Sequence, residues 1–224
     1  MKKLEIEKYL FGIYCAGIII QNILATKNID ILMFTVTTGI LVSPLVFIIQ
    51  DVQTEIFGYK KAKKMIILGY AMNFIAIILY MLSICIPSSE TYTNQTAFAT
   101  ILGTTPRIAI ASFIAYITGS LMNSKIMEGL KKKYNNNLFF RAISSTIVGQ
   151  FIDSLIFFVA VAVSISSSPI FIVAYLFSVI AFIGILPMQT IISMIVGGTI
   201  FEIIYEIIFY PITKALIKKI KANR

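Results

Sequence analysis

Long apolar runs separated by short polar segments dominate the chain between Tyr9 and Tyr210. Each run approaches the length of about 20 residues that a helix needs to cross a hydrocarbon layer roughly 30 Å thick. The pattern predicts membrane-spanning helices at residues 9–26, 31–50, 65–86, 106–124, 142–163 and 190–211. We therefore expect an all-α fold, a polytopic membrane helix bundle with about six transmembrane helices.

Composition supports lipid as the solvent of these helices. Of the 224 residues, 58% are hydrophobic and 13% are charged, and the mean hydropathy is +0.90. Soluble proteins are nearer half apolar and a quarter charged. Six spans occupy about half of the chain and leave only short loops. We expect residues 1–224 to form a single integral membrane domain.

The basic residues explain the net charge of +9 and predict the topology. All 19 lysines and arginines except Lys27 and Arg107 lie in four groups, within residues 2–8, 60–64, 125–141 and 214–224. Because basic loops stay in the cytoplasm, both termini and every second loop are expected inside, which requires an even number of crossings. This distribution favours a membrane orientation signal over a direct nucleic-acid partner.

Two segments test this topology. Residues 170–187 are apolar, but Gly184 and Pro187 interrupt them, and a seventh crossing would place the basic tail outside. We interpret this segment as a broken or re-entrant piece buried by protein, because irregular backbone at membrane depth does not face lipid. At the other end, Gln21 and Asn22 without a following small-residue cleavage site favour a retained first span over a signal peptide.

Composition also excludes several kinds of chemistry. The chain has no histidine, and Cys15 and Cys85 lie far apart inside apolar runs. No GxSxG nucleophile motif and no phosphate-binding G-x-x-x-x-G-K-[ST] loop is present. We therefore expect no metal, no cofactor and no enzymatic activity.

Acidic residues inside the apolar runs are the main functional candidates, because each charge at membrane depth costs about 2.5 to 3.5 kcal/mol. Asp153 stands among apolar neighbours well inside the fifth predicted span, three residues after Gln150. Residues three or four apart share one helix face. Gln150 and Asp153 therefore predict a polar face on this helix, for which we favour a functional role.

Two further acidic pairs have this spacing. Asp51 and Glu55 lie at the inner end of the second predicted span, and Glu202 and Glu206 lie in the last. Each pair has a structural alternative. Asp51 and Glu55 can sit at the water interface, and Glu202 and Glu206 can pair with Arg107 or the basic tail as contacts between helices.

Three stretches of the sequence resemble a known family. They are QDVQTEIFGYKKAKK from Gln50, RAISSTIVGQFIDSLIFF from Arg141 and YEIIFYPITKALIKKIK from Tyr205. They resemble the VUT family of queuosine precursor transporters, and the resemblance extends from about Asn22 to Lys221. Its most specific motif is R-x-x-x-S-x-x-x-x-Q-x-x-D, formed here by Arg141, Ser145, Gln150 and Asp153. The matching Asp51 and Gly58 add to it, whereas some members lack the pair Tyr205 and Glu206.

The resemblance implies a multi-pass protein of the bacterial cytoplasmic (inner) membrane that imports 7-deazaguanine bases for tRNA modification. These bases are the cyano and aminomethyl precursors of queuosine, or queuine itself. A carboxylate can accept the adjacent N–H donors of a guanine-like edge as a pair, a role that suits Asp153 or Glu206. Gln150 and Asn22 can bind the carbonyl side, aromatic rings can stack on the base, and a second acid can meet a cationic amine.

The candidate substrate-binding residues are thus Asn22, Asp51, Glu55, Arg141, Ser145, Gln150, Asp153, Glu202, Tyr205 and Glu206. The expected partners are a small nucleobase-like substrate and the lipid bilayer, and a homodimer is left open. A buried carboxylate that exchanges a proton as substrate binds can couple uptake to the proton gradient. Facilitated diffusion is the alternative.

Three other classes of protein are alternatives for this sequence. A substrate-binding membrane subunit of an energy-coupling factor transporter also has about six spans, but it requires partner ATPases. A membrane-embedded hydrolase would use Asp51, Asp153 and Ser145, although no known catalytic spacing is present. A structural scaffold would leave acids on three helices unexplained.

Overall fold

The computed structural model describes residues 3–134, 137–165 and 188–222, and these residues are mostly helical. Six long α-helices lie within this part: α1 (Lys3–Leu24), α2 (Ser43–Phe57), α3 (Tyr59–Cys85), α4 (Gln95–Lys131), α5 (Leu138–Ile165) and α7 (Met188–Ala222). Five predicted spans coincide with α1, α3, α4, α5 and α7 to within a few residues or lie inside them. The predicted re-entrant segment 170–187 lies outside the described residues.

The predicted span at 31–50 is corrected by the structure. Strands β1 (Asn28–Ile31) and β2 (Phe34–Thr37) form an antiparallel hairpin, and a short 3₁₀ turn, η1 (Thr38–Leu41), leads into α2. Apolar and polar residues alternate along NIDI and FTVT, which is the period of a strand rather than a helix. The chain reverses at Leu32, which has a positive φ of 55°. The fold is therefore a helix bundle with one small β-hairpin.

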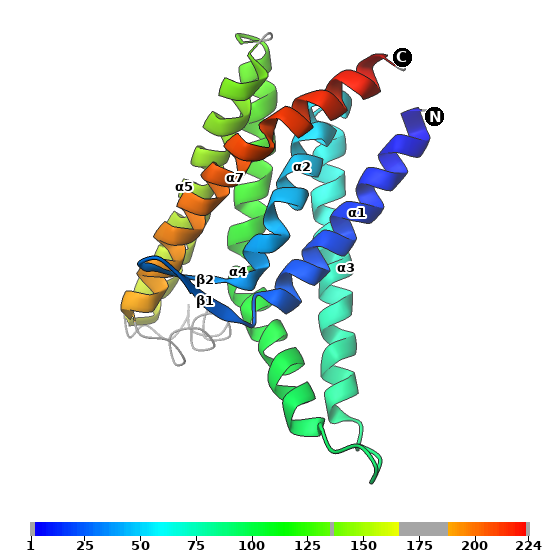
Figure 1. Cartoon of the computed structure of the whole chain (residues 1–224), viewed down its shortest axis with the longest axis vertical. Helices are drawn as coiled ribbons and strands as arrows, with labels where there is room; N and C mark the ends of the chain where they lie inside the picture. The colour runs from blue at the N-terminus through cyan, green and yellow to red at the C-terminus, as the bar shows by residue number, and fades with distance from the viewer. Residues whose placement is uncertain (1–2, 135–136, 166–187, 223–224) are drawn as a thin grey trace.

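The helices alternate in direction, so that the two ends of the chain lie at the same end of the bundle (Figure 1). The groups of basic residues around α3's start, α4's end and α7's end also lie there. α4 packs along α3 and α5, and α2 contacts α1, α3, α4 and α7. The apolar core joins α1, α2, α3 and α7 through side chains that include Tyr14, Val52, Ile66 and Ile217.

The corner between α2 and α3 requires a glycine and a partner from α4. Gly58 has a φ of +83°, a conformation that residues with a side chain rarely adopt. Glu128 Oε1 accepts a hydrogen bond from the backbone N–H of Tyr59 at 2.9 Å, which satisfies one free donor at the start of α3. This corner places the inner half of α2 against α4.

The exterior of α3 is apolar. Ile67, Phe74, Ile75, Leu79 and Leu82 are all exposed, and a continuous apolar surface of this kind fits contact with lipid. By length and hydropathy, α3 is the one helix among the described residues that can cross a membrane on its own.

Candidate functional site

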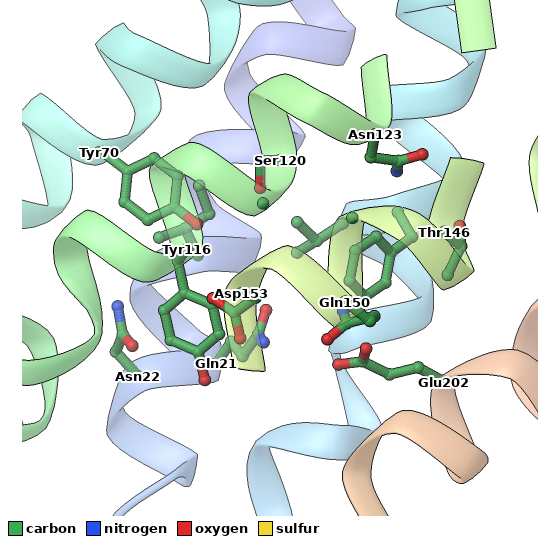
Figure 2. Close-up of a pocket in the computed structure, with 15 residues that line it drawn as sticks. Gln21, Asn22, Tyr70, Tyr116, Ser120, Asn123, Thr146, Gln150, Asp153 and Glu202 are labelled. Atoms are coloured by element: carbon green, nitrogen blue, oxygen red, sulfur yellow. The ribbon is translucent and has the colours of Figure 1, made fainter. Parts of the chain in front are cut away.

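A polar cavity lies between the helices and is lined by all six of them (Figure 2). α1 contributes Gln21 and Asn22, α3 contributes Tyr70, and α7 contributes Glu202. The remaining polar lining comes from α4 and α5, with Tyr116, Ser120, Asn123, Thr146, Gln150 and Asp153. Val46 and Phe47 of α2 add an apolar wall. We call this space the first cavity.

Close contact between α4 and α5 positions the wall of the first cavity that carries Asp153 and Asn123, which we call the acidic wall. A Cβ at Gly119 would lie 3.0 Å from both Asp153 Cβ and the Gly149 carbonyl oxygen. A Cβ at Gly149 would lie 2.9 Å from Asn123 Cβ. Only glycine at both positions lets the two backbones approach this closely, as small residues do at helix interfaces in membranes. Asp153 and Asn123 therefore stand beside the crossing point and line the cavity.

Several polar atoms of this wall have no hydrogen-bond partner among the described residues. Asp153 Oδ1, Glu202 Oε2 and the side-chain amide of Asn123 are enclosed, and within the described part of the chain no hydrogen-bond partner reaches them. Asp153 and Glu202 also interact electrostatically with each other. In Figure 2 the Glu202 carboxylate faces Gln150, and Asp153 lies near Tyr116 and Gln21. Buried acceptors without partners are costly, so the arrangement is suited to a ligand that supplies N–H donors.

A second cavity adjoins the first and shares Phe47, Thr146 and Glu202 with it. It lies between α2, α5 and α7, and its polar lining is Ser43, Asp51, Thr146, Glu202, Tyr205, Glu206, Tyr210 and Thr213. Asp51 and Glu206 interact directly across it, from α2 and α7. A mainly apolar space that carries these polar side chains thus continues from the first cavity to Asp51 of α2.

Glu55 forms a separate ion cluster at the basic end of the bundle. Arg141 Nη1 donates to Glu55 Oε2 at 2.7 Å, and Lys221 Nζ donates to Oε1 at 2.7 Å. Lys131 Nζ donates to the Glu55 carbonyl oxygen at 2.6 Å and lies 3.3 Å from Oε1. The side chains of Arg141 and Glu55 are only 1% and 2% exposed. One acidic residue of α2 therefore contacts basic residues of α4, α5 and α7.

The ten residues predicted from the sequence lie in different surroundings in the structure. Asn22, Gln150, Asp153 and Glu202 line the first cavity. Asp51, Tyr205 and Glu206 line the second, together with Glu202. Glu55 and Arg141 pair with each other and line neither cavity. Ser145 is fully buried, and its hydroxyl donates to the Ala142 carbonyl at 2.9 Å.

The structure bears on two structural alternatives from the sequence. Asp51 and Glu55 are buried between helices, at 2% and 4% exposure, and Glu55 pairs with Arg141, Lys131 and Lys221 rather than with Lys60 or Lys61. In the basic tail, Lys221 contacts Glu55 rather than Glu202 or Glu206, and the side chain of Arg107 lies outside the described residues. The reason is that Glu206 lies opposite Asp51 of α2, whereas Lys221, in the last turns of α7, reaches Glu55 one turn further along α2.

Sequence reasoning missed the polar face of α4. Tyr116, Ser120 and Asn123 are spaced by four and three residues, so they share one helix face, and all three line the first cavity. This spacing was the available signal. Thr146 on α5 was missed as well, although it lies seven residues before Asp153 on the same face.

A helix bundle with an apolar exterior and buried polar cavities lined by several helices is the architecture of a membrane transport protein. The chain belongs to the family described as "Putative vitamin uptake transporter", which matches residues 37–216. It is 22% identical over 212 residues to a "Probable queuosine precursor transporter" of Bacillus subtilis, a match that covers 94% of this chain and 82% of the relative.

A second relative with the same name, from Haemophilus influenzae, is 30% identical over 128 residues. That match covers 56% of this chain and 51% of the relative. No solved structure matches the chain. These findings confirm the family resemblance drawn from the sequence and, with it, a protein of the membrane.

Proposed function

We propose that this protein imports queuosine precursors, which are 7-deazaguanine bases, and that the first cavity is the base-binding site. The observation that carries the proposal is the enclosed Asp153 Oδ1, which no hydrogen-bond partner reaches within the described residues, in a cavity lined by all six described helices. The relative that matches over 94% of the chain carries the name of such a transporter. A buried acceptor and a guanine-like donor edge are chemically complementary.

The cavity offers a place for each part of a flat base. Asp153 accepts the adjacent N–H donors of the guanine-like edge, and Glu202, in the same cavity, lies where it can accept from an amine. The amides of Gln150 and Asn22 donate to the carbonyl side. Tyr70 and Tyr116 supply aromatic faces for stacking. We expect the paired donors to contribute most to affinity, because charge-assisted hydrogen bonds are stronger than neutral ones.

The proposed topology has six crossings with both termini in the cytoplasm. Six long helices of alternating direction, with both chain ends and the basic groups at one end, support it. Basic residues are retained on the cytoplasmic side of membrane proteins. The protein thus spans the bacterial cytoplasmic membrane several times, with the Glu55 cluster near the inner face and the first cavity farther from it.

Competition uptake tests the substrate class. A host that cannot make queuosine and lacks its own importer is supplied with labelled queuine, in the presence of unlabelled queuine, either precursor base, or guanine. We expect the deazaguanines to compete and guanine to compete weakly or not at all. Failure of every deazaguanine to enter, with the protein present in the membrane, would overturn the proposal.

Purified protein in liposomes tests whether it acts alone. Vesicles preloaded with unlabelled base should exchange it for labelled base outside, without ATP and without other subunits. A requirement for co-purified ATPase subunits would instead assign the chain to the energy-coupling factor class.

A further inference from the structure

Asp51 and Glu206 form a pair of acidic side chains that the base-binding site does not use. Asp51 lies on α2 and Glu206 on α7, and they interact across the second cavity beside Thr146 of α5. Asp51 is 2% exposed, as is Thr146. Asp51 Oδ1, both carboxylate oxygens of Glu206 and Thr146 Oγ1 are enclosed, and among the described residues they have no hydrogen-bond partner of standard geometry.

Two buried carboxyl groups in contact are expected to share a proton. Two ionised carboxylates only accept hydrogen bonds, so they repel each other when they meet in a buried place. One proton shared between them converts the repulsion into an O–H···O hydrogen bond. Asp51 and Glu206 have the contact that a shared proton needs, and their enclosed oxygen atoms are not exposed to the bulk solvent that would otherwise stabilise two charges.

The surrounding charges favour one proton rather than two or none. The titratable and charged groups around the pair are Glu55 on α2, Lys131 on α4, Arg141 on α5, and Glu202, Tyr205, Tyr210 and Lys221 on α7. Arg141 interacts electrostatically with Asp51 but donates its hydrogen bond to Glu55. Glu55 also pairs with Lys221 and Lys131. The cluster thus carries more positive than negative charge one turn from Asp51, which stabilises one ionised carboxylate in the pair.

A metal cation fits the pair less well. Hard cations such as Ca²⁺ take about six to eight oxygen ligands. Asp51, Glu206 and Thr146 offer two carboxylates and one hydroxyl, and the described part of the chain holds no group of three or more acidic, histidine or cysteine side chains arranged around a metal ion.

We propose that Asp51 and Glu206 share an exchangeable proton that is carried with the base, so that this pair, and not Asp153, couples uptake to the proton gradient. This inference rests on the proposed function. The second cavity is separate from the base edge at Asp153 but is joined to the first through Thr146 and Glu202. Occupancy of the base site can therefore change the surroundings of the pair, and protonation can change α2 and α7, which line both cavities.

Proteoliposomes separate coupling from binding. For one proton per base, a gradient of one pH unit, acidic outside and with the membrane potential clamped, can drive about tenfold accumulation. The wild type should accumulate base under this gradient and should also exchange base when both sides have the same pH. The double variant Asp51→Asn/Glu206→Gln should retain exchange at the wild-type rate and lose all accumulation. Glu7→Gln, a carboxyl-to-amide change in a surface pair with Lys61, is the matched control and should behave like the wild type.

Infrared spectroscopy of the purified protein gives a readout that needs no transport. On acidification of the wild type, one component of the protonated-carboxyl band should come from the pair, and this component should be lost in the double variant but not in Glu7→Gln. If the double variant does not fold, each single variant should show the same retained exchange and lost accumulation.

Several results would overturn the assignment. Loss of exchange in folded variants would place the pair in the base site, and accumulation that follows a sodium gradient would identify a different cation. A protonated-carboxyl band of the same shape and area in the double variant as in the wild type would place the proton elsewhere. Exchange without a response to any ion gradient would remove the coupling role and leave the proposed function intact, whereas absence of wild-type exchange for every deazaguanine would remove the proposed function itself.

Discussion

Two buried acids of this bundle have opposite surroundings. Glu55 is held by Arg141, Lys131 and Lys221, from three other helices. Asp153 has an enclosed oxygen that no hydrogen-bond donor reaches within the described part of the chain. In the sequence, Glu55 lies at the end of an apolar run close to Lys60 and Lys61, whereas Asp153 lies well inside one, but neither position shows which acid is paired in the structure.

This difference indicates different roles for the two residues, structural for Glu55 and substrate-related for Asp153. A satisfied acid contributes to how the helices are held, whereas an unsatisfied acid in a cavity is a cost that a ligand can offset. Substitutions of the two residues should therefore affect different measurements, stability for Glu55 and transport for Asp153.

The largest effect is expected from Glu55→Gln. Removing one partner of a buried ion pair leaves the other charge uncompensated and costs about 3 to 5 kcal/mol. For a chain of this size that lowers the melting temperature by roughly 10 °C. Thermal unfolding in detergent measures it, with Glu7→Gln as the control because its partner Lys61 is half exposed. An unchanged melting temperature would show that the cluster does not hold the helices.

Asp153→Asn should reduce uptake about 100-fold without lowering the melting temperature. The amide replaces one acceptor by a donor that opposes the donors of the base, and loss of charge-assisted hydrogen bonds costs about 1.5 to 3 kcal/mol each. Initial uptake rates at equal amounts of membrane protein measure the effect. Asp30→Asn in the hairpin, where Thr35 donates to the carboxylate, makes the same exchange outside the cavity and should transport normally. Normal transport by the Asp153 variant would remove the central residue of the site.

Gly149→Ala tests how the acidic wall is positioned. The added methyl group would meet Asn123 Cβ at 2.9 Å, so α4 and α5 must move apart, at a cost of about 1 to 3 kcal/mol. We expect lower stability together with reduced uptake, because Asp153 moves with α5. Gly129→Ala on α4 is the control, since nothing lies within 4 Å of a Cβ there. Equal behaviour of the two variants would show that the close approach is dispensable.

The smallest effect is expected from Lys131→Gln. This lysine is partly exposed, and such a pair contributes up to about 1 kcal/mol to the free energy of unfolding. Lys132→Gln removes the same charge from an exposed neighbour and should leave stability unchanged. Substituting Lys131, Lys132 and Lys133 together should reduce the fraction of correctly oriented molecules, measured by labelling of the termini, without changing the KM of those that remain.

The sequence predicted the long helices well because a run of apolar residues is a local signal. The sequence analysis missed the hairpin because residues 28–37 run directly into the apolar residues of the second predicted span. That apolar run outweighed the alternation of polar and apolar residues along NIDI and FTVT. The alternation was visible, but two short strands between helices contribute little to a pattern dominated by spans.

The sequence predicted part of the polar lining of the two cavities, but not which residues line which cavity. Asp153 and Gln150 were found because polar groups in an apolar helix are expensive. The pairing of Glu55 with Arg141 joins residues 86 positions apart and depends on the packing and rotation of α2 and α5, which no local pattern specifies. The same holds for Asp51 and Glu206, which are in contact between α2 and α7 and line a different cavity from Asp153.

The hairpin between α1 and α2 has a further consequence for the shape of the bundle. α2 contains 15 residues and is therefore about 22 Å long, which is shorter than a hydrocarbon layer of roughly 30 Å. The two strands pair with each other and β2 packs against α7, so this non-helical backbone is partly covered by protein, as irregular backbone at membrane depth must be. A helix as short as α2 leaves the remaining distance to the hairpin, so strands, and not a helix, form this end of the bundle between α1 and α2.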